Sequence, residues 1–382
     1  MAFYRTFGQA RRAVLLGMVG VAVLALPGCQ TGPRGPGPGP EPVGPPIIPG
    51  AVQNRIALIV PMTGGDGQVG QSIANAAKLA LLDAGDQSLK ITVYDSTAPG
   101  GAAAATSRAI AEGSRLILGP LLAEDVRAAA PVAREAGIPV IAFSNDEGVA
   151  GDGVYLMGFT PDQSINRVVS FAKGRGVTRF AGLVPTGLYG QRAAQAMLGA
   201  VRRSGGTVAT IESFDRSPIA VAAAVKRLNA KGSFDAVLIG DSGRIAALAA
   251  PAVRVGPHLL GTELWASDKS LGKTRALRGA WFAAAPDTQF QRLVTRYRAK
   301  YGRTPYRLAS LGYDGVLLAV RSARNWPIGH PFPTRSLVDE DGFGGVDGNF
   351  RFGRDGVAER LLEVRQVTVS GTTTVSPAAT AF

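Results

Sequence analysis

Runs of consecutive apolar residues alternate with segments of helical period along most of the chain. The first four runs are RIALIVP, ITVYDS, RLILGP and IPVIAFS, and predicted helices at 71–82, 101–112 and 123–136 separate them. Strands that are apolar on both faces and alternate with helices of this length are typical of a parallel sheet covered on both sides. The pattern therefore predicts an α/β lobe that begins near Asn54.

A second series with the same alternation begins near Thr160. Its apolar runs are RFAGLVP, TVATIESF, FDAVLIG and HLLG, and its helices are predicted at 161–174, 190–204, 218–231 and 243–253. Two such series predict two doubly wound parallel-sheet lobes. Ligands of open α/β sheets bind at the carboxyl ends of the strands, so we expect a site in the cleft between the lobes.

The first residues have the pattern of a secretory signal. Arg5, Arg11 and Arg12 precede an apolar segment that is uncharged from residue 13 to residue 28. Such a segment is short for a membrane span and is typical of a signal peptide, here 1–28. We expect the chain to be exported.

The one cysteine of the chain, Cys29, follows this segment directly. The stretch Leu26-Pro27-Gly28-Cys29 resembles the bacterial lipobox, whose cysteine is lipidated and becomes the new N-terminus. Gln30 in place of an aspartate implies the periplasmic side of the outer membrane rather than the inner membrane. A free or buried cysteine is the alternative to lipidation.

Residues 29–53 are predicted to be a lipid-bearing linker. Residues 31–50 contain eight prolines and six glycines without a three-residue period. An extended segment of this kind spans about 60 Å at roughly 3.1 Å per residue. We expect it to hold the folded part away from the membrane.

Composition argues against an enzyme. One cysteine and two histidines, His258 and His330, exclude a disulfide framework, a cysteine zinc site and an iron–sulfur cluster, and leave little room for histidine-dependent catalysis. We therefore expect no catalytic residue, no metal and no cofactor. The motif GDSG at 240–243 resembles a protease or esterase motif, but it lies between a strand and a helix without a matching histidine.

Positive charge is concentrated in one segment. The chain has 41 Lys and Arg against 28 Asp and Glu, and residues 267–307 hold ten of the basic residues with only two acids. This segment is either a solvated helical face or a surface for anionic partners. We expect no nucleic-acid partner, because the export signal separates the protein from nucleic acid.

Residues 54–377 resemble the type I periplasmic binding proteins of the branched-chain amino-acid receptor group. The resemblance rests on IALIVPMTGGDGQVGQSIANAAKLAL, LILGPLLAEDVRAAAPVAREAGIPVIAFSND and FQRLVTRYRAKYGRTPYRLASLGYDGVLLAVRSA. It implies a hinge crossed three times, near 158, 285 and 333. The first lobe would then comprise 54–158 plus 286–333, the second lobe 159–285 plus 334–377, and the tail 378–382.

Two functions compete within this superfamily. Solute receptors deliver amino acids or related metabolites to an ABC permease, and activator lipoproteins contact a penicillin-binding protein that synthesises peptidoglycan. Receptors have a serine-rich turn where this chain has Gly119-Pro120-Leu121-Leu122-Ala123-Glu124, and Leu122 and Ala123 carry no side-chain donor for a carboxylate. The sequence Gly-Pro-Leu-Leu at this turn resembles that of the activator group. We therefore expect a non-catalytic lipoprotein that activates a peptidoglycan synthase, with the solute receptor as the alternative.

The resemblance also implies which loops face the cleft. They hold a set of candidate ligand-binding residues: Thr63, Gly65, Gly119, Pro120, Leu121, Leu122, Ser144, Asn145, Asp146, Tyr189, Asp241, Ser242, Glu263 and Trp265. Asp314 is expected to cap or brace the hinge.

Overall fold

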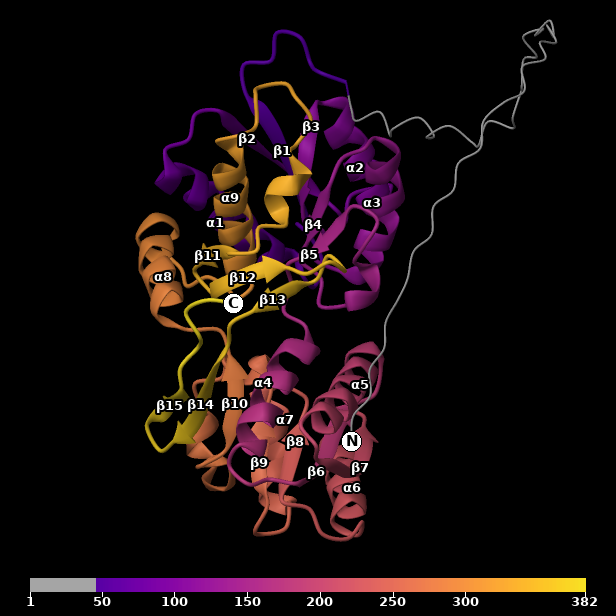
Figure 1. Cartoon of the computed structure of the whole chain (residues 1–382), viewed down its shortest axis with the longest axis vertical. Coiled ribbons are helices and arrows are strands. Elements are labelled where there is room, and N and C mark those ends of the chain that lie inside the picture. Colours follow the sequence, from indigo (N-terminus) through magenta and orange to yellow (C-terminus); the bar gives the residue numbers. More distant parts are fainter. Residues whose placement is uncertain (1–45) are drawn as a thin grey trace, which may run out of the picture. The chain divides into compact units, whose positions relative to one another are not determined.

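The first lobe is built on a five-stranded parallel sheet. The computed structural model describes residues 46–382, so the predicted signal peptide, Cys29 and the linker up to residue 45 lie outside the described residues (Figure 1). The strand order is β2-β1-β3-β4-β5. The strands are β1 (Asn54–Val60), β2 (Leu89–Asp95), β3 (Ser114–Leu118), β4 (Val140–Ala142) and β5 (Val154–Leu156).

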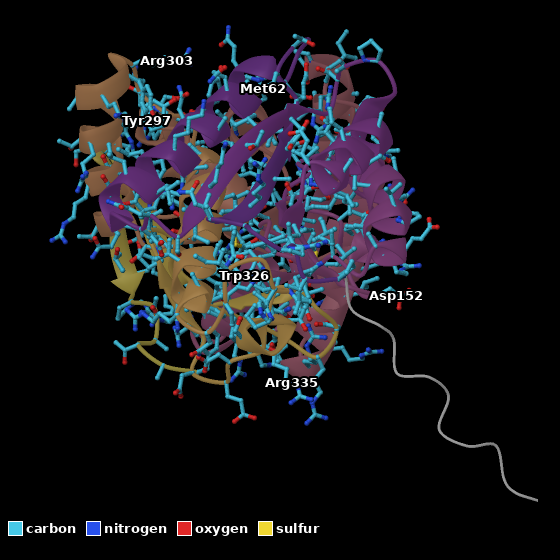
Figure 2. All side chains as sticks on the ribbon, turned by 90° about the horizontal axis from the view of Figure 1, so that it is seen from above. Met62, Asp152, Tyr297, Arg303, Trp326 and Arg335 are labelled. Atoms are coloured by element: carbon cyan, nitrogen blue, oxygen red, sulfur yellow. The ribbon has the colours of Figure 1, made fainter. Side chains whose placement is uncertain are left out.

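Helices cover both faces of this sheet because its central strands are apolar on both sides. All five residues of β3 are buried. The helices are α1 (Gly67–Ala84), α2 (Gly101–Ala111), α3 (Ala123–Glu135), α8 (Thr288–Tyr301) and α9 (Ala309–Ala323). One core joins α1 and α9 to the sheet, and a second lies under α2 and α3. Tyr297 of α8 is fully buried against α1, where its hydroxyl oxygen accepts a hydrogen bond from Asn75 Nδ2 at 3.2 Å (Figure 2).

The second lobe has a seven-stranded mixed sheet of order β15-β14-β10-β9-β8-β6-β7. Its parallel strands are β6 (Arg179–Pro185), β7 (Thr207–Phe214), β8 (Ala236–Ile239), β9 (His258–Gly261) and β10 (Trp281–Ala284). The strands β14 (Glu363–Thr368) and β15 (Gly371–Ser376) add to it in antiparallel order. Its helices are α4 (Pro161–Lys173), α5 (Leu188–Arg203), α6 (Pro218–Asn229) and α7 (Gly243–Ala249). The predicted α/β fold class with two parallel-sheet lobes is confirmed.

The boundary of one predicted helix differs for a chemical reason. The apolar pattern predicted a helix over 243–253, but α7 ends at Ala249 and a 3-10 turn covers Ala250–Ala252. Pro251 lies in that turn and has no N–H to donate to the preceding turn. The α-helix therefore ends at Ala249, four residues before the predicted end at 253.

A small antiparallel sheet lies on the first lobe, not on the second lobe to which 334–377 was assigned. It consists of β11 (Phe343–Gly345), β12 (Gly348–Phe352) and β13 (Ala358–Arg360). Phe343, Phe350 and Phe352 are buried in the same apolar core as β1 and α9. The alternation of these aromatic residues with polar ones turns one face of the sheet toward that core.

The third crossing between the lobes therefore lies at 361–362 rather than near 333. Leu362 and Val364 are the first residues after β13 to join a core of the second lobe. The other two crossings lie close to Gly158 and Pro286. A Cβ atom on Gly158 would lie 1.9 Å from the Ser144 carbonyl oxygen, so only glycine fits where the chain leaves the first lobe.

The predicted tail, 378–382, packs back onto the small sheet. Asn349 Nδ2 donates to the Thr380 carbonyl oxygen at 2.9 Å, and the Arg351 guanidinium lies 4.5 Å from the centre of the Phe382 ring. These contacts give the C-terminus a defined place beside β12.

Candidate functional site

A cavity of about 440 Å³ lies between the two lobes at the carboxyl ends of their strands. The first lobe contributes residues that follow β1, β3 and β4 and a segment before α9, and the second lobe contributes residues that follow β9 and β10. The wall is mostly apolar, with a few polar groups at separate points. It consists of Asp66, Val69, Leu121, Leu122, Phe143, Asn145, Phe159, Glu263, Leu264, Ala266, Ser267, Ala284, Ala285, Tyr306, Arg307 and Leu308.

The loop between β3 and α3 brings two leucines into this wall. Gly119 has a positive φ of 84°, and a Cβ atom there would lie 2.1 Å from the Ile59 carbonyl oxygen. The carbonyl oxygen of Pro120 accepts a hydrogen bond from Phe143 N at 2.9 Å, which ties the loop to the end of β4. Gly119 and Pro120 thus shape the loop, while Leu121 and Leu122 line the cavity.

Glu263 is the carboxylate that the second lobe presents to the cavity. It begins a 3-10 turn, Glu263–Trp265, directly after β9. Ser164 Oγ donates to one carboxylate oxygen and the Tyr189 hydroxyl donates to the other at 3.2 Å. Burial raises the pKa of Glu263, although these hydrogen bonds act in the opposite direction.

Tyr189 holds Glu263 from behind rather than lining the cavity. Its hydroxyl also lies 3.4 Å from Thr262 Oγ1. Burial and the nearby charge of Glu263 raise the pKa of Tyr189 well above its usual value, so this phenol stays protonated and acts as a donor. Tyr189 therefore positions the carboxylate.

Trp265 was predicted to face the cleft and instead belongs to the core of the second lobe. Its side chain is fully buried, and its Nε1–H donates to the Asp241 carbonyl oxygen at 3.0 Å. Its ring packs against Gly261, where an added Cβ atom would lie 2.3 Å from the indole. The short turn after β9 thus directs Trp265 inward and Glu263 toward the cavity.

Asp241 and Ser242 do not line the cavity either. Asp241 forms an ion pair with Arg216 at 2.7 Å and accepts a hydrogen bond from Ser242 N at 2.6 Å. His258 pairs in register with Ala236 at the start of β8, whereas Ser242 follows the end of that strand. The serine and this histidine therefore lie at opposite ends of the sheet, which excludes their pairing as nucleophile and base.

The loop after β1 contributes different residues from those predicted. Thr63 and Gly65 are exposed, and Thr63 Oγ1 is 2.7 Å from Thr97 Oγ1. Asp66 and Val69, a few residues further on, line the cavity instead. Of the three residues predicted after β4, only Asn145 lines the cavity. Ser144 is buried, and its Oγ accepts a hydrogen bond from Asp146 N at 3.1 Å.

Asp146 connects the lobes. It receives Arg127 from α3 of the first lobe and Arg192 from α5 of the second, whose Nη2 lies 2.9 Å from Asp146 Oδ1. Only 2% of the Asp146 side chain is exposed. Burial would raise the pKa of Asp146, but the Gly148 N–H and the two arginines outweigh it and leave that pKa lowered. We call this group the clasp.

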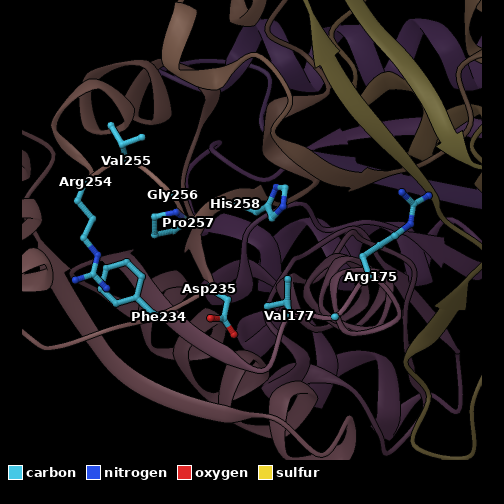
Figure 3. Close-up of a pocket in the computed structure, with 10 residues that line it drawn as sticks. Arg175, Val177, Phe234, Asp235, Arg254, Val255, Gly256, Pro257 and His258 are labelled. Carbon is cyan, nitrogen blue, oxygen red and sulfur yellow. The ribbon is translucent and has the colours of Figure 1, made fainter.

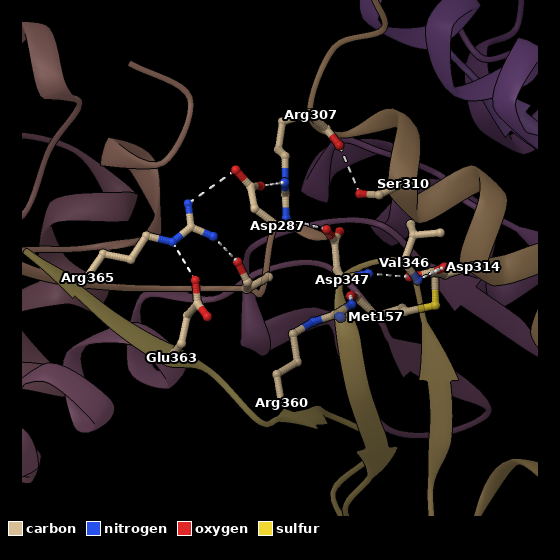
Figure 4. Close-up of polar contacts among 11 residues, drawn as sticks. Met157, Asp287, Arg307, Ser310, Asp314, Val346, Asp347, Arg360, Glu363 and Arg365 are labelled. Carbon is tan, nitrogen blue, oxygen red and sulfur yellow. Dashed lines mark hydrogen bonds and ion pairs between the residues drawn. The ribbon is translucent and has the colours of Figure 1, made fainter. Parts of the chain in front are cut away.

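A network of arginines and aspartates occupies the hinge (Figure 4). Arg307 lines the cavity and forms ion pairs with Asp287 at 2.6 Å and with buried Asp347. Arg365 of β14 approaches the other oxygen of Asp287 at 3.4 Å. Asp287, on the second crossing, therefore receives an arginine from each lobe. No sequence pattern predicts this network, because its members are far apart in the chain.

Two buried carboxylates face each other in this network. Asp314 accepts a hydrogen bond from Val346 N at 2.8 Å and lies beside Asp347. Burial and the charge of Asp347 raise the pKa of Asp314 to about 7. Arg360 lies close by and donates to the Met157 carbonyl oxygen at 2.5 Å. Asp314 had been expected to brace the hinge, and its contacts join α9 to the segment between β11 and β12.

A second hollow of about 450 Å³ lies at the opposite end of the second lobe (Figure 3). Its polar groups are engaged with the protein itself: Asp235 accepts hydrogen bonds from Thr178 N at 2.9 Å and Arg179 N at 2.8 Å. The Arg254 guanidinium lies 3.8 Å from the centre of the Phe234 ring. This hollow is open and lies away from the carboxyl ends of the strands, so the cavity between the lobes is the candidate ligand site.

Within 46–382, no group of three or more His, Cys, Asp and Glu side chains is arranged to hold a metal ion. None of the helices in this range is both long enough and apolar enough to cross a membrane.

Comparison with protein families assigns the chain to a class. A family model described as "Periplasmic binding protein" matches residues 53–371. The chain therefore belongs to this family of periplasmic binding proteins, a ligand-binding fold rather than an enzyme family.

The similar solved structures have the same fold. The putative branched-chain amino acid ABC transporter from Rhodospirillum rubrum has a TM-score of 0.73 and 20% identity, with 85% of this chain and 100% of that chain covered. The leucine binding protein LivK from Thermotoga maritima has a TM-score of 0.64 and 22% identity, with 85% of this chain and 98% of that chain covered. The predicted membership of the type I periplasmic binding protein superfamily is confirmed, whereas a closer relation to the activator group is not shown.

A curated relative is similar over a shorter region. Uncharacterized protein RP748 from Rickettsia prowazekii (strain Madrid E) is 26% identical over 175 residues, which are 46% of this chain. The chain spans about half the length of that relative, 47%.

Proposed function

We propose that this protein is a solute receptor that binds a small apolar molecule between its lobes and presents it to an ABC permease. The observation that carries the proposal is the cavity of about 440 Å³ with Leu121, Leu122 and Phe143 in its wall. A cavity of this size and character suits a small, largely apolar ligand. The branched-chain amino acid and solute-binding neighbours support the same function.

The three crossings give the receptor a means to respond to its ligand. A ligand that contacts both lobes binds the closed arrangement more tightly and so increases its population. The clasp residues Arg192 and Asp146 form an ion pair across the lobes in the structure, and we expect this pair to stabilise the closed arrangement. We expect the receptor to be non-catalytic, with closure rather than turnover as its output.

A cavity-filling variant tests this proposal. Leu122→Trp fills the cavity from the first lobe, and Leu198→Trp makes the same change on the exposed side of α5 as a matched control. A library of amino acids, amines, aromatic acids and other small metabolites is screened by thermal shift and followed by calorimetry. A ligand present at 100 times its Kd stabilises the protein by about 2.7 kcal/mol.

The receptor proposal predicts that at least one compound binds with 1:1 stoichiometry. Leu122→Trp should weaken that binding by about tenfold or more, which is about 1.4 kcal/mol, while Leu198→Trp leaves it unchanged. Failure of every compound to bind, or equal effects of the two variants, would contradict the proposal.

Activation of a peptidoglycan synthase remains a second candidate. It rests on the sequence Gly119-Pro120-Leu121-Leu122 and on the basic segment 267–307. Mature protein with Cys29→Ser is used to capture partners from detergent-solubilised membranes. Capture of a penicillin-binding protein, with no ligand in the thermal screen, would favour this candidate over the receptor.

The lipid anchor and the outer-membrane location belong to the proposal as well. The anchor rests on Arg11 and Arg12, the apolar residues 13–28 and then Cys29, and the outer-membrane location rests on Gln30 in place of an aspartate. Metabolic labelling with a fatty-acid analogue is expected to mark the wild-type protein but not Cys29→Ser, and membrane fractionation then locates it. A labelled Cys29→Ser protein would refute lipidation at this residue.

A further inference from the structure

The charges around the cavity favour one class of ligand. Two carboxylates line the wall, Asp66 at the exposed lip and Glu263 further inside. Among the described residues that line the cavity, Arg307 is the single cationic side chain. The net charge that the wall presents to a ligand therefore depends on whether Arg307 is free to contact that ligand.

The guanidinium of Arg307 is already paired with carboxylates of the hinge network. Its two terminal nitrogens reach Asp287, at 2.6 Å, and Asp347, so one guanidinium neutralises part of two carboxylates. Its plane also lies 3.9 Å from the centre of the Phe290 ring. A ligand carboxylate would have to displace one of these aspartates to gain a bidentate partner. The wall is thus net negative toward a bound molecule.

The first lobe offers little compensation for a negative ligand. Helix α3 begins beside the cavity, but its first turn already holds Glu124 and Asp125. Leu122 precedes that turn and has no polar side-chain atom. A carboxylate at this place would meet backbone N–H groups together with two like charges, which oppose it.

Glu263 has unused capacity to accept hydrogen bonds. A carboxylate offers about four lone-pair sites, and Ser164 and Tyr189 each occupy one. Both donors are neutral, so the negative charge of Glu263 has no cationic partner of its own among these contacts. A carboxylate held in an apolar wall without a counter-charge is costly, and a cationic ligand removes that cost.

The apolar part of the wall fits the rest of such a ligand. Phe143 and Phe159 line the cavity from the first lobe and the first crossing, and Leu264 faces them from the second lobe. The Arg360 guanidinium already lies 4.4 Å from the centre of the Phe159 ring, so these aromatic side chains offer the ligand hydrocarbon contacts. A molecule with one ammonium group and a branched or aromatic hydrocarbon body therefore matches both the charge and the surface of the cavity.

We propose that the cavity selects apolar amines that carry no carboxylate, and that Glu263 pairs with their ammonium group. The proposal rests on the proposed receptor function and assigns its substrate class. It separates this chain from a receptor for zwitterionic amino acids or for organic acids, because the amine is required and the carboxylate is unfavourable.

Two matched ligand series test this selectivity by titration calorimetry on the mature full-length protein. The first compares 3-methylbutylamine, leucine and 4-methylpentanoate, and the second compares 2-phenylethylamine, phenylalanine and 3-phenylpropanoate. Within each series the hydrocarbon is nearly constant and only the charged groups change. We expect the amine to bind at least about tenfold more tightly than the other two members of its series.

The variant Glu263→Gln keeps the size of the side chain and removes its charge. It should lower amine affinity by about tenfold or more and abolish the preference for the amine. Glu135→Gln, an exposed acid at the other end of α3, is the matched control and should leave the preference intact. Thermal unfolding without ligand shows whether Glu263→Gln is folded, and the charge-conserving Glu263→Asp should retain part of the preference.

The outcomes separate this proposal from the receptor function. Tighter binding of an amino acid or an acid, with loss in Leu122→Trp, would overturn the amine class and leave the receptor standing. Equal amine binding by the wild type and Glu263→Gln would also overturn it. Absence of binding by all six compounds and by the wider library would overturn both.

Discussion

At the scale of single residues, two positions of one short turn have opposite roles. Glu263 presents its carboxylate to the cavity, while Trp265, two positions later, is fully buried in the second lobe. A tight turn points neighbouring side chains in different directions, so spacing alone does not tell which one meets the ligand. Ser164 and Tyr189, from two other elements, complete the environment of Glu263.

The titration of Glu263 gives a pH prediction for ligand binding. An ammonium group pairs with the ionised carboxylate, and burial raises the pKa of Glu263. Amine affinity should therefore weaken as the pH falls through that raised pKa, and it should recover at higher pH. Calorimetry between about pH 4 and pH 8 measures this, and Glu263→Gln should show a flat profile over the same range. A pH-dependent Glu263→Gln would point to a different titrating group.

Asp314 gives a second pH prediction, for stability. Its pKa is raised to about 7 in the folded protein, while an unfolded aspartate titrates near about 3.9. The folded state binds this proton more tightly, so the contribution to stability is complete below the unfolded pKa and is lost as the pH rises toward 7. The slope is at most about 1.4 kcal/mol per pH unit.

The variant Asp314→Asn isolates that contribution. Urea unfolding of the wild type and the variant at several pH values gives the difference in free energy of unfolding. We expect the free energy of unfolding of the variant to increase relative to that of the wild type as the pH rises from about 4 to about 7, since the asparagine stays neutral. A difference that does not depend on pH would contradict the raised pKa.

At the scale of elements, the small sheet β11–β13 decides where the lobes end. Its aromatic side chains pack with β1 and α9, and Leu156 N donates to the Gly356 carbonyl oxygen at 2.7 Å next to β5. The sheet thereby extends the first lobe to residue 360 and places Asp347 beside Arg307 and Asp314. The hinge network exists because this sheet lies on the first lobe.

Phe350→Ala tests the assignment of the small sheet. Phe350 is 1% exposed, and loss of a buried phenylalanine costs about 3–5 kcal/mol. Hydrogen exchange should speed up in β1, α9 and β11–β13, with little change in β6–β9 of the second lobe. Phe382→Ala, at an exposed residue of the tail, is the control and should cost much less. Faster exchange mainly in the second lobe would contradict this assignment and support the predicted placement of 334–377 in the second lobe.

At the scale of the whole molecule, contacts on both sides of the cavity connect the lobes. The hinge network lies at the crossings, and the clasp of Asp146, Arg127 and Arg192 joins α3 and α5. Exposed ion pairs contribute little, but Asp146 is almost fully buried, so the loss of one arginine removes a charge-assisted hydrogen bond from a desolvated carboxylate. We expect the clasp to favour the closed arrangement.

Arg192→Ala is expected to open the lobes. Small-angle scattering of the ligand-free variant should give a larger radius of gyration, and ligand affinity should fall by about tenfold, because closure then costs more. Arg202→Ala changes an exposed arginine at the end of the same helix and should leave both quantities unchanged. Identical scattering of the two variants would show that the clasp does not hold the lobes together.

Much of the fold could be predicted from the sequence because the apolar runs have a clear period. The strands from RIALIVP to HLLG and the helices between them occur where the pattern predicted them, apart from shifts of a few residues at their ends. The site could be predicted only in part. Leu121, Leu122, Asn145 and Glu263 line the cavity, whereas ten other candidates lie beside it, support it or are buried in the lobes. Loops after parallel strands point toward a common edge, but side-chain direction within a loop has no period.

The sequence by itself therefore determined the two α/β lobes, the place of the cleft and the family, since these follow from hydrophobic periodicity and from long matching segments. Only the tertiary structure decided that Asp146 joins the lobes, that Arg307 is bound to Asp287 and Asp347, and that Glu263 is left as the acceptor in an apolar wall. Each of these depends on groups separated by tens to hundreds of residues. Charge pairing and burial act through space, so their outcome appears only once the lobes are packed.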